Sequence, residues 1–142
     1  MIYTPMTKAA MRICYDAHAG QVDKTGLPYV FHPYHLAEQM ETEETVCAAL
    51  LHDVMEDTPI TADDLRAEGI SEPVMEALAL LTHDPHVPYL EYVQNLSGNP
   101  IARAVKIADL RHNSDLTRLE QVTQKDERRV QKYTRALQLL NE

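Results

Sequence analysis

Tryptophan is absent from this sequence of 142 residues, phenylalanine occurs once, and glycine occurs only four times. With no repeat or low-complexity tract either, this composition excludes a fibrous or disordered chain. No apolar run approaches the roughly 20 residues that a membrane-spanning helix needs. The N-terminus also lacks the charged-then-apolar order of a signal peptide. We therefore expect a cytoplasmic protein with no membrane partner.

Positive charge is scarce, because 13 lysines and arginines stand against 22 acidic residues and leave a net charge of −9. Proteins bind nucleic acids largely by neutralising phosphates, so we expect no nucleic-acid partner. A small phosphorylated substrate remains compatible, since a metal ion and a few placed cations can hold phosphate. Cys14 and Cys47 lie in apolar helical patterns without C-x-x-C spacing, which predicts buried free thiols.

The hydrophobic pattern predicts consecutive helices within a single domain, residues 1–142. Leu50, Leu51 and Val54 recur at helical spacing, and only residues 27–31 ("LPYVF") have an extended pattern. We therefore expect an all-α fold, a compact orthogonal helical bundle. The predicted helices span roughly 4–19, 32–40, 43–56 and 61–69, followed by helices that begin near Ser71, Pro88 and Asn99 and a last helix over 126–141.

Four residues of metal-ligand type occur in three separate segments: His32, the adjacent pair His52 and Asp53, and Asp109. Imidazole with carboxylate is the ligand mix for a divalent first-row metal that keeps positions open for water and substrate. Taken alone, His32 is explained as simply by a core or helix-start histidine. The pair follows the apolar "AALL" segment, so it is expected to be partly buried. Buried ionisable groups need a partner or a metal.

Further polar groups follow these candidates at helical spacing. Glu56 and Asp57 lie one turn beyond His52 and Asp53, at the helix end where the dipole disfavours carboxylates and a nearby cation would offset the cost. A solvated helix end is the alternative explanation for an acidic stretch of this kind. Asn113 lies one turn beyond the aspartate of the third segment. It could orient a ligand or water, or it could cap the helix.

Three cations are candidates for binding an anionic substrate. Lys24 lies in a glycine-bounded loop, while Arg103 and Lys106 are three residues apart on the helix that carries Asp109. Surface solvation is the simpler explanation for any one of them alone. Three further histidines are candidate phosphate contacts or spectators: His18, His35 and His112.

In order and spacing, these segments resemble the HD superfamily of metal-dependent phosphohydrolases. More narrowly, they resemble the hydrolase domain of RelA/SpoT-type alarmone enzymes and their small stand-alone relatives. The resemblance rests on "AHAGQVDKTGLPYVFHP", "AALLHDVMEDT" and "ARAVKIADLRHN", and it covers roughly residues 9–119. It implies a helical bundle of the HD type that binds one metal ion, usually Mn²⁺ in that family, through four ligands: His32, His52, Asp53 and Asp109.

The resemblance also implies roles around the metal. Glu56 and Asp57 match the pair that positions or activates the attacking water, Asn113 matches the asparagine of the "LADRLHN" segment, and Lys24 matches a basic loop residue near the nucleotide. In the family, the reaction removes pyrophosphate from the 3′ position of guanosine tetra- or pentaphosphate. The residue chemistry agrees, because such a metal lowers the pKa of bound water and a carboxylate can take the proton.

Two departures from the family bear on the substrate. Asp23 stands where alarmone enzymes commonly have an arginine, and a basic stretch is replaced by residues 81–96, which lack lysine and arginine but include Tyr89 and Tyr92. We expect a small phosphorylated nucleotide as substrate, with alarmone 3′-pyrophosphate release as the first candidate. The alternatives are a phosphatase acting on the 2′-phosphate of NADPH or on a nucleoside monophosphate, and a non-catalytic nucleotide-sensing module. The sequence leaves the oligomeric state open.

Overall fold

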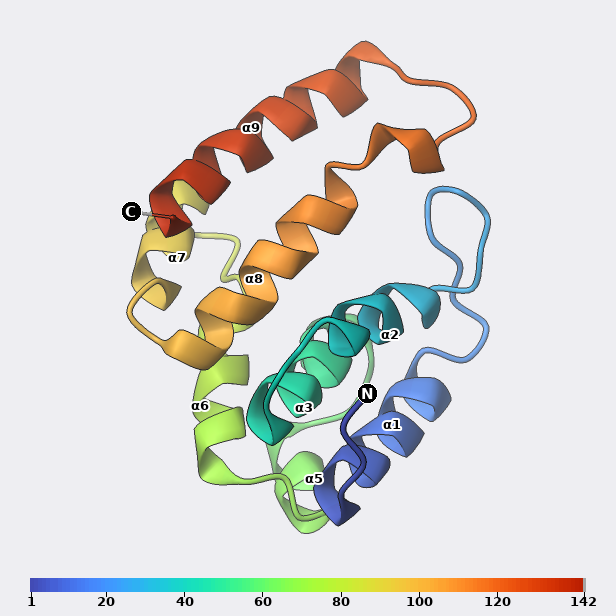
Figure 1. The fold of residues 1–142 in the computed structure, drawn as a ribbon, viewed down its shortest axis with the longest axis vertical. Helices are drawn as coiled ribbons and strands as arrows, with labels where there is room; N and C mark the ends of the chain where they lie inside the picture. The colour runs from blue at the N-terminus through green and yellow to red at the C-terminus, as the bar shows by residue number, and fades with distance from the viewer. Residues whose placement is uncertain (142) are drawn as a thin grey trace.

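The computed structural model describes residues 1–141, and the regular elements within them are helices (Figure 1). The prediction of an all-α bundle is confirmed. The one extended pairing in this part of the chain is an antiparallel bridge between Val22 and Pro28. The elements are α1 (Pro5–Ala17), α2 (Phe31–Glu38), α3 (Glu43–Leu51), α4 (Val54–Asp57), α5 (Ala62–Ala67), α6 (Glu72–Leu81), α7 (Tyr89–Leu96), α8 (Pro100–Asn113), the 3-10 helix η1 (Leu116–Arg118) and α9 (Gln124–Leu140).

Polar side chains cap the starts of several helices. Thr4, Thr42 and Thr123 each accept a hydrogen bond from the amide three residues on, and the side chain at that position bonds back to the cap. This reciprocal arrangement satisfies two amides that have no partner within the helix. The side chain of Asn99 caps α8 by accepting a hydrogen bond from the amide of Ala102, without a bond in return, and Pro100 follows at the first helical position. These starts agree with the sequence predictions to within about two residues.

Helix α3 lies at the centre of the fold and packs against α1, α2, α6 and α8. Every side chain from Val46 to Leu51 is fully buried, as expected for a helix that is apolar on all sides. The buried apolar side chains of the described residues form one cluster around it. Helices α8 and α9 lie side by side in the upper half of Figure 1, so α8 joins the core to the C-terminal helix.

The single helix predicted over residues 43–56 is interrupted in the structure. Helix α3 ends at Leu51, and a turn at His52 and Asp53 precedes α4. Asp53 has φ −109° and ψ 0°, far from the values of about −63° and −42° in a helix. In a continuous helix, the carbonyl of Ala49 would accept a hydrogen bond from the amide of Asp53. Here it accepts one from His52 Nδ1 at 2.6 Å instead. The side chain therefore replaces the backbone bond and breaks the helix.

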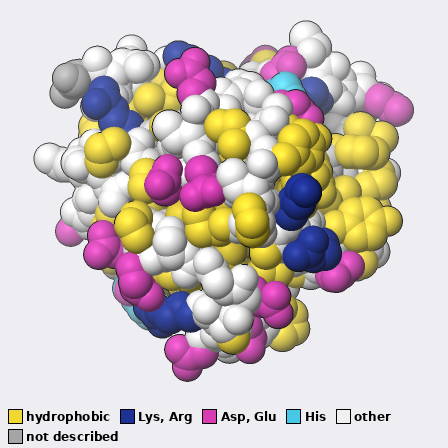
Figure 2. All heavy atoms as spheres, turned by 60° about the horizontal axis from the view of Figure 1, so that its bottom comes forward, with side chains coloured by type: hydrophobic (Ala, Val, Ile, Leu, Met, Phe, Trp, Pro, Cys, Tyr) yellow, Lys and Arg dark blue, Asp and Glu magenta, His cyan; other side chains and the backbone are white. Residues whose placement is uncertain are grey.

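The helix lengths, the surface and the two cysteines agree with what the composition indicated. Within residues 1–141, no helix is long and apolar enough to cross a membrane. Figure 2 shows the face at the lower end of Figure 1, where acidic, basic and apolar side chains are intermixed. Cys14 and Cys47 are free and buried, which confirms the prediction made from their apolar helical context.

Candidate metal centre and active site

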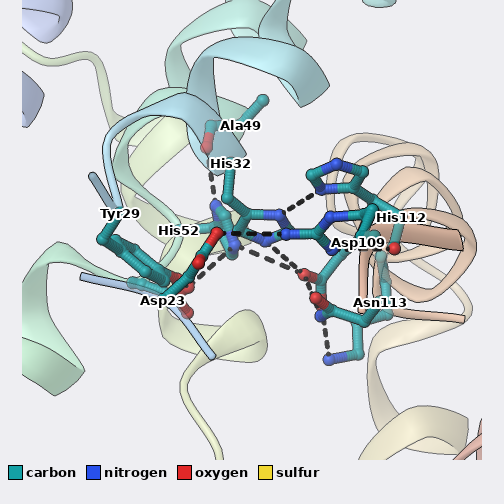
Figure 3. Close-up of polar contacts among 11 residues, drawn as sticks. Asp23, Tyr29, His32, Ala49, His52, Asp109, His112 and Asn113 are labelled. Carbon is teal, nitrogen blue, oxygen red and sulfur yellow. Dashed lines mark hydrogen bonds and ion pairs between the residues drawn. The ribbon is translucent and has the colours of Figure 1, made fainter. Parts of the chain in front are cut away.

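Three segments that are distant in sequence bring the predicted metal ligands together (Figure 3). His32 comes from α2, His52 from the turn after α3, and Asp109 from α8; their ligand atoms lie within 4.8 Å of one another. Asp109 Oδ1 is 2.9 Å from His32 Nε2 and 3.6 Å from His52 Nε2. Asp53 joins the group through its Oδ2, which is 3.0 Å from His52 Nε2. We call these four residues the ligand group.

The interrupted helix explains how two neighbouring residues serve one site. On a continuous helix, His52 and Asp53 would point about 100° apart. In the turn between α3 and α4, both side chains face the same point, and the imidazole is anchored by the carbonyl of Ala49. The turn therefore brings the side chains of two adjacent residues to one candidate site.

The donor set of the ligand group fits a divalent metal ion. Because His52 Nδ1 donates to a carbonyl, Nε2 carries the lone pair in the neutral ring. That buried nitrogen lies 3.0 Å from Asp53 Oδ2 and 3.6 Å from Asp109 Oδ1. Burial acts to lower the pKa of His52, but Asp53 and Asp109 outweigh it and hold the pKa well above its ordinary value. The site thus attracts a cation, and two imidazoles with two carboxylates suit a first-row metal.

Asp109 is held from two further directions. Lys106 Nζ donates to Oδ2 at 3.1 Å, and Asn113 Nδ2 donates to Oδ1 at 3.0 Å. Burial acts to raise the pKa of Asp109, but the Lys106 charge and the two histidines hold it well below its ordinary value. The carboxylate is therefore ionised. Lys106 and Asn113 were both predicted to lie at the site, and each bonds the candidate metal ligand Asp109.

Tyr29 holds a second ligand and is a residue that the sequence analysis missed. Its hydroxyl donates to Asp53 Oδ2, and Figure 3 shows the ring beside the ligand group. Burial raises the pKa of Tyr29, and the charge of Asp53 adds to the effect, so the hydroxyl keeps its proton and remains a donor. The only signal in the sequence was its position, three residues before His32.

His112 holds the third ligand. Its Nδ1 lies 2.7 Å from His32 Nδ1, and the two rings are stacked with centroids 5.0 Å apart. If a metal ion took the place of the proton on His32 Nε2, Nδ1 would carry the ring proton and donate to His112, an outer contact of the kind that orients a metal-binding imidazole. Burial lowers the pKa of His112 to about 4, with Arg118 adding to the effect, so the ring is neutral and accepts. This role differs from the phosphate contact or spectator that the sequence suggested.

Glu56 and Asp57 lie on α4, exposed to solvent beside the buried ligands. Their carboxylates and that of Asp53 lie within 4.8 Å of one another. Glu56 Oε1 accepts a hydrogen bond from the amide of His83 at 3.0 Å. Partial burial raises the pKa of both residues, and the charge of Asp53 adds to it. A carboxylate with a raised pKa takes a proton from water more readily.

Two cavities open on the ligand group. The loop-side cavity, of about 330 Å³, lies against His32 and the loop that contains Asp23 and Lys24. The tyrosine-side cavity, of about 250 Å³, lies against the other three ligands, Glu56, and the α7 tyrosines. Asn113 and Tyr133 line both cavities. The ligand group therefore lies where two distinct spaces meet.

The structure places the three candidate cations differently. Lys24 is exposed at the loop-side cavity, and Lys106 lines the tyrosine-side cavity with its ammonium already paired. Arg103 does not join the site, although its spacing from Lys106 suggested that the two would act together. Its Nε donates to the carbonyl of Leu140 at 2.6 Å. Carbonyls at a helix C-terminus lack helical partners and attract cations, so the end of α9 draws this guanidinium away.

No protein-family model matches the chain. The bifunctional (p)ppGpp synthase/hydrolase SpoT of Escherichia coli K12 is 47% identical over 62 residues, covering 41% of this chain and 9% of SpoT. The guanosine-3′,5′-bis(diphosphate) 3′-pyrophosphohydrolase of Aquifex aeolicus is 37% identical over 78 residues, which cover 52% of this chain and 11% of that enzyme. A probable enzyme of the same name from Synechocystis is 26% identical over 140 residues, which cover 89% of this chain and 18% of that enzyme. The chain spans less than a fifth of the length of these relatives.

A solved structure, described as a metazoan ortholog of SpoT that hydrolyses ppGpp, shares the fold. Its TM-score is 0.79 at 22% identity, over 99% of this chain and 88% of the other. The resemblance to RelA/SpoT-type hydrolases is confirmed. The same comparison confirms the predicted compact helical bundle. The shared fold thus covers nearly the whole described chain.

Proposed function

We propose that this chain is a metal-dependent phosphohydrolase domain that removes the 3′-pyrophosphate of guanosine tetra- or pentaphosphate and releases GDP or GTP. The observation that carries the proposal is the convergence of His32, His52 and Asp109, with Asp53 and the Glu56 carboxylate beside them. Relatives named for this activity support it. A small phosphorylated nucleotide is then the partner, and neither nucleic acid nor membrane is required.

Mn²⁺ is the proposed metal. Two imidazoles and two carboxylates from His32, His52, Asp53 and Asp109 would hold it, whereas Mg²⁺ prefers oxygen ligands. When bound, the ion would lower the pKa of a coordinated water and polarise a phosphate oxygen. Tyr29 and the outer contacts described above keep the ligands oriented toward it.

Glu56 is the proposed general base. It faces the tyrosine-side cavity, its pKa is raised, and the amide of His83 orients its carboxylate. It would take the proton of the attacking water. Asp57 contributes a second negative charge that raises the pKa of Glu56 further. In the reaction, the water oxygen bonds to the phosphorus attached to O3′, the P–O3′ bond breaks, and O3′ takes up a proton.

The loop-side cavity is the proposed site of the nucleoside. Its volume of about 330 Å³ falls in the range of about 300–1,000 Å³ that is typical of small-molecule pockets. Lys24 lies at its lining, where a cation can meet the phosphates of a nucleotide. The two buried free cysteines suit a reducing compartment, so we place the protein in the cytoplasm.

The test is product analysis of the purified protein loaded with Mn²⁺, using guanosine tetraphosphate, NADPH and nucleoside monophosphates as parallel substrates. We expect GDP and pyrophosphate from the tetraphosphate, and neither product from the Asp53→Ala variant. Phosphate released only from NADPH or a monophosphate would move the activity to that substrate. Binding of the tetraphosphate with no product would show a nucleotide-sensing module instead.

A further inference from the structure

We infer that the tyrosine-side cavity is a subsite for the distal phosphate of a pyrophosphoryl group, with Lys132 as the residue that selects for it. This inference rests on the proposed function and deepens it. It also separates the candidate substrates, because guanosine tetraphosphate carries a pyrophosphoryl group at the reacting position. The 2′-phosphate of NADPH and a nucleoside monophosphate carry a single phosphate there.

The first argument is the position of the cavity. His32 lines the loop-side cavity, whereas His52, Asp53 and Asp109 line the tyrosine-side cavity. A phosphorus atom held at the ligand group therefore has one space for the nucleoside and a separate space for whatever else is attached to it. Glu56 also lines this second space, so the proposed base and the second phosphate would lie on the same side.

The second argument is size. At about 250 Å³, the cavity is smaller than the roughly 300–1,000 Å³ of pockets that hold whole small molecules. A cavity needs only about 10–15 Å³ to hold one water molecule, so this space accommodates a phosphate group with several waters. A nucleoside fits better in the larger cavity on the other side.

The third argument is charge. Two lysines line the cavity, and Lys106 is already paired with Asp109 at 3.1 Å. Lys132, on α9, enters none of the ion pairs formed within residues 1–141. Its ammonium lies 4.4 Å from the ring centroid of Tyr89 and 5.6 Å from that of Tyr133. Aromatic faces attract a cation but leave its charge in place, so this lysine can still pair with an anion.

The chemistry of the bond decides what would occupy the space. When the P–O3′ bond of a 3′-pyrophosphate breaks, the distal phosphate stays attached to the phosphorus that the water attacks. It therefore remains at the ligand group throughout the reaction, within reach of the tyrosine-side cavity. A monophosphate substrate has no such group and would leave the cavity to water. Lys132 would then stabilise only the pyrophosphoryl substrate.

The test compares two substrates that differ by one phosphate: guanosine 5′-diphosphate with a 3′-diphosphate or a 3′-monophosphate. The Mn²⁺-loaded enzyme should hydrolyse the first with a higher kcat/KM. We expect Lys132→Met to lower kcat/KM for the 3′-diphosphate about tenfold, the scale of one hydrogen bond to a charged group, and to change the 3′-monophosphate reaction less than about twofold. Lys132→Arg should restore most of the loss.

A matched control is Lys125→Met, which removes an exposed lysine from the first turn of α9, outside both cavities. It should leave both reactions unchanged. Equal losses on both substrates in Lys132→Met, or no loss on either, would overturn the subsite while leaving the hydrolase proposal intact. If the wild-type enzyme hydrolyses neither substrate, calorimetry with inorganic pyrophosphate and phosphate decides. A pyrophosphate preference that survives Lys132→Met would then overturn the inference.

Discussion

Two arginines at the loop-side cavity and one lysine at the tyrosine-side cavity hold their positive charges in different ways. In the loop-side cavity, the guanidinium of Arg118 lies 3.3 Å from Asp23 Oδ2, and that of Arg129 is paired with Asp126. In the tyrosine-side cavity, the ammonium of Lys132 rests on aromatic rings. A carboxylate neutralises a cation, whereas a ring only attracts it.

On the loop side, the ion pair between Arg118 and Asp23 helps to shape the cavity. Asp23 Oδ1 accepts hydrogen bonds from the amides of Thr25 at 2.8 Å and Leu27 at 3.1 Å, which closes the loop on itself. Arg118 then joins the loop to the segment after α8, through Asp23 and through the carbonyl of His112. Asp23 thus bonds its own loop. Lys132 on the tyrosine side enters none of the ion pairs formed within residues 1–141.

The largest effect should come from Asp109, which lines the tyrosine-side cavity and contacts His32 at the loop-side cavity. Asp109→Asn keeps the shape but removes the charge that binds His32, His52 and a metal. A metal contributes several kcal/mol of transition-state stabilisation, so we expect activity to fall by more than about 10³-fold. Metal content after dialysis against Mn²⁺, measured by mass spectrometry, should fall with it. Full metal occupancy in this variant would contradict the assigned ligand group.

The next effect should be confined to the tyrosine side. Glu56→Gln keeps an oxygen that can accept the amide of His83 but cannot take a proton. We expect kcat to fall about 10²-fold or more, while Mn²⁺ content and KM stay close to wild type. Steady-state kinetics beside a metal assay separates these quantities. A kcat near that of the wild type would exclude Glu56 as the base and direct attention to Asp57.

A moderate effect should come from the loop side of the ligand group. His112→Phe keeps the stacked ring but removes the nitrogen that accepts from His32, and losing such an outer contact costs about 10–100-fold in metal affinity. Titration of Mn²⁺ by calorimetry measures it. The matched control is His35→Phe. The exposed His35 ring lies with its centroid 4.2 Å from that of His112, but it bonds none of the ligand group. If both variants bind Mn²⁺ equally well, His112 does not position the site.

The smallest effect should come from the ion pair that shapes the loop. Partial burial acts to raise the pKa of Asp23, but bonds from Thr25 and Leu27 outweigh it and hold the pKa below its ordinary value of 3.8. The stability that this carboxylate contributes is therefore present above that value and is lost as pH falls through the lower, folded-state pKa. Asp23→Asn should cost about 1 kcal/mol at pH 7.

Urea denaturation measures this cost, and the gap between wild type and variant should shrink as pH is lowered toward 3. Asp16→Asn is the control, because this exposed carboxylate enters none of the ion pairs of residues 1–141 and should change stability little at either pH. A gap that is independent of pH would show that the charge of Asp23 does not stabilise the loop.

Much of this fold could be predicted because its signals are local. A capping side chain such as Thr4 or Thr123 acts within one helical turn, so the helix starts could be read residue by residue. The ligand candidates could also be chosen, since His52 and Asp53 follow an apolar run and their burial requires a partner. The pattern of residues 43–56, in contrast, contained no glycine or proline, so nothing in it indicated a break.

The amino-acid sequence by itself determined the helical architecture, the ligand types and the order in which they occur, because helix periodicity and donor chemistry belong to individual residues and short segments. Only the tertiary structure decided which polar groups meet. It drew Arg103 to the end of α9, set His112 against His32, and placed Lys132 on the rings beside the proposed base. These contacts join helices far apart in the chain, and the spacing within one helix carries no information about its neighbour.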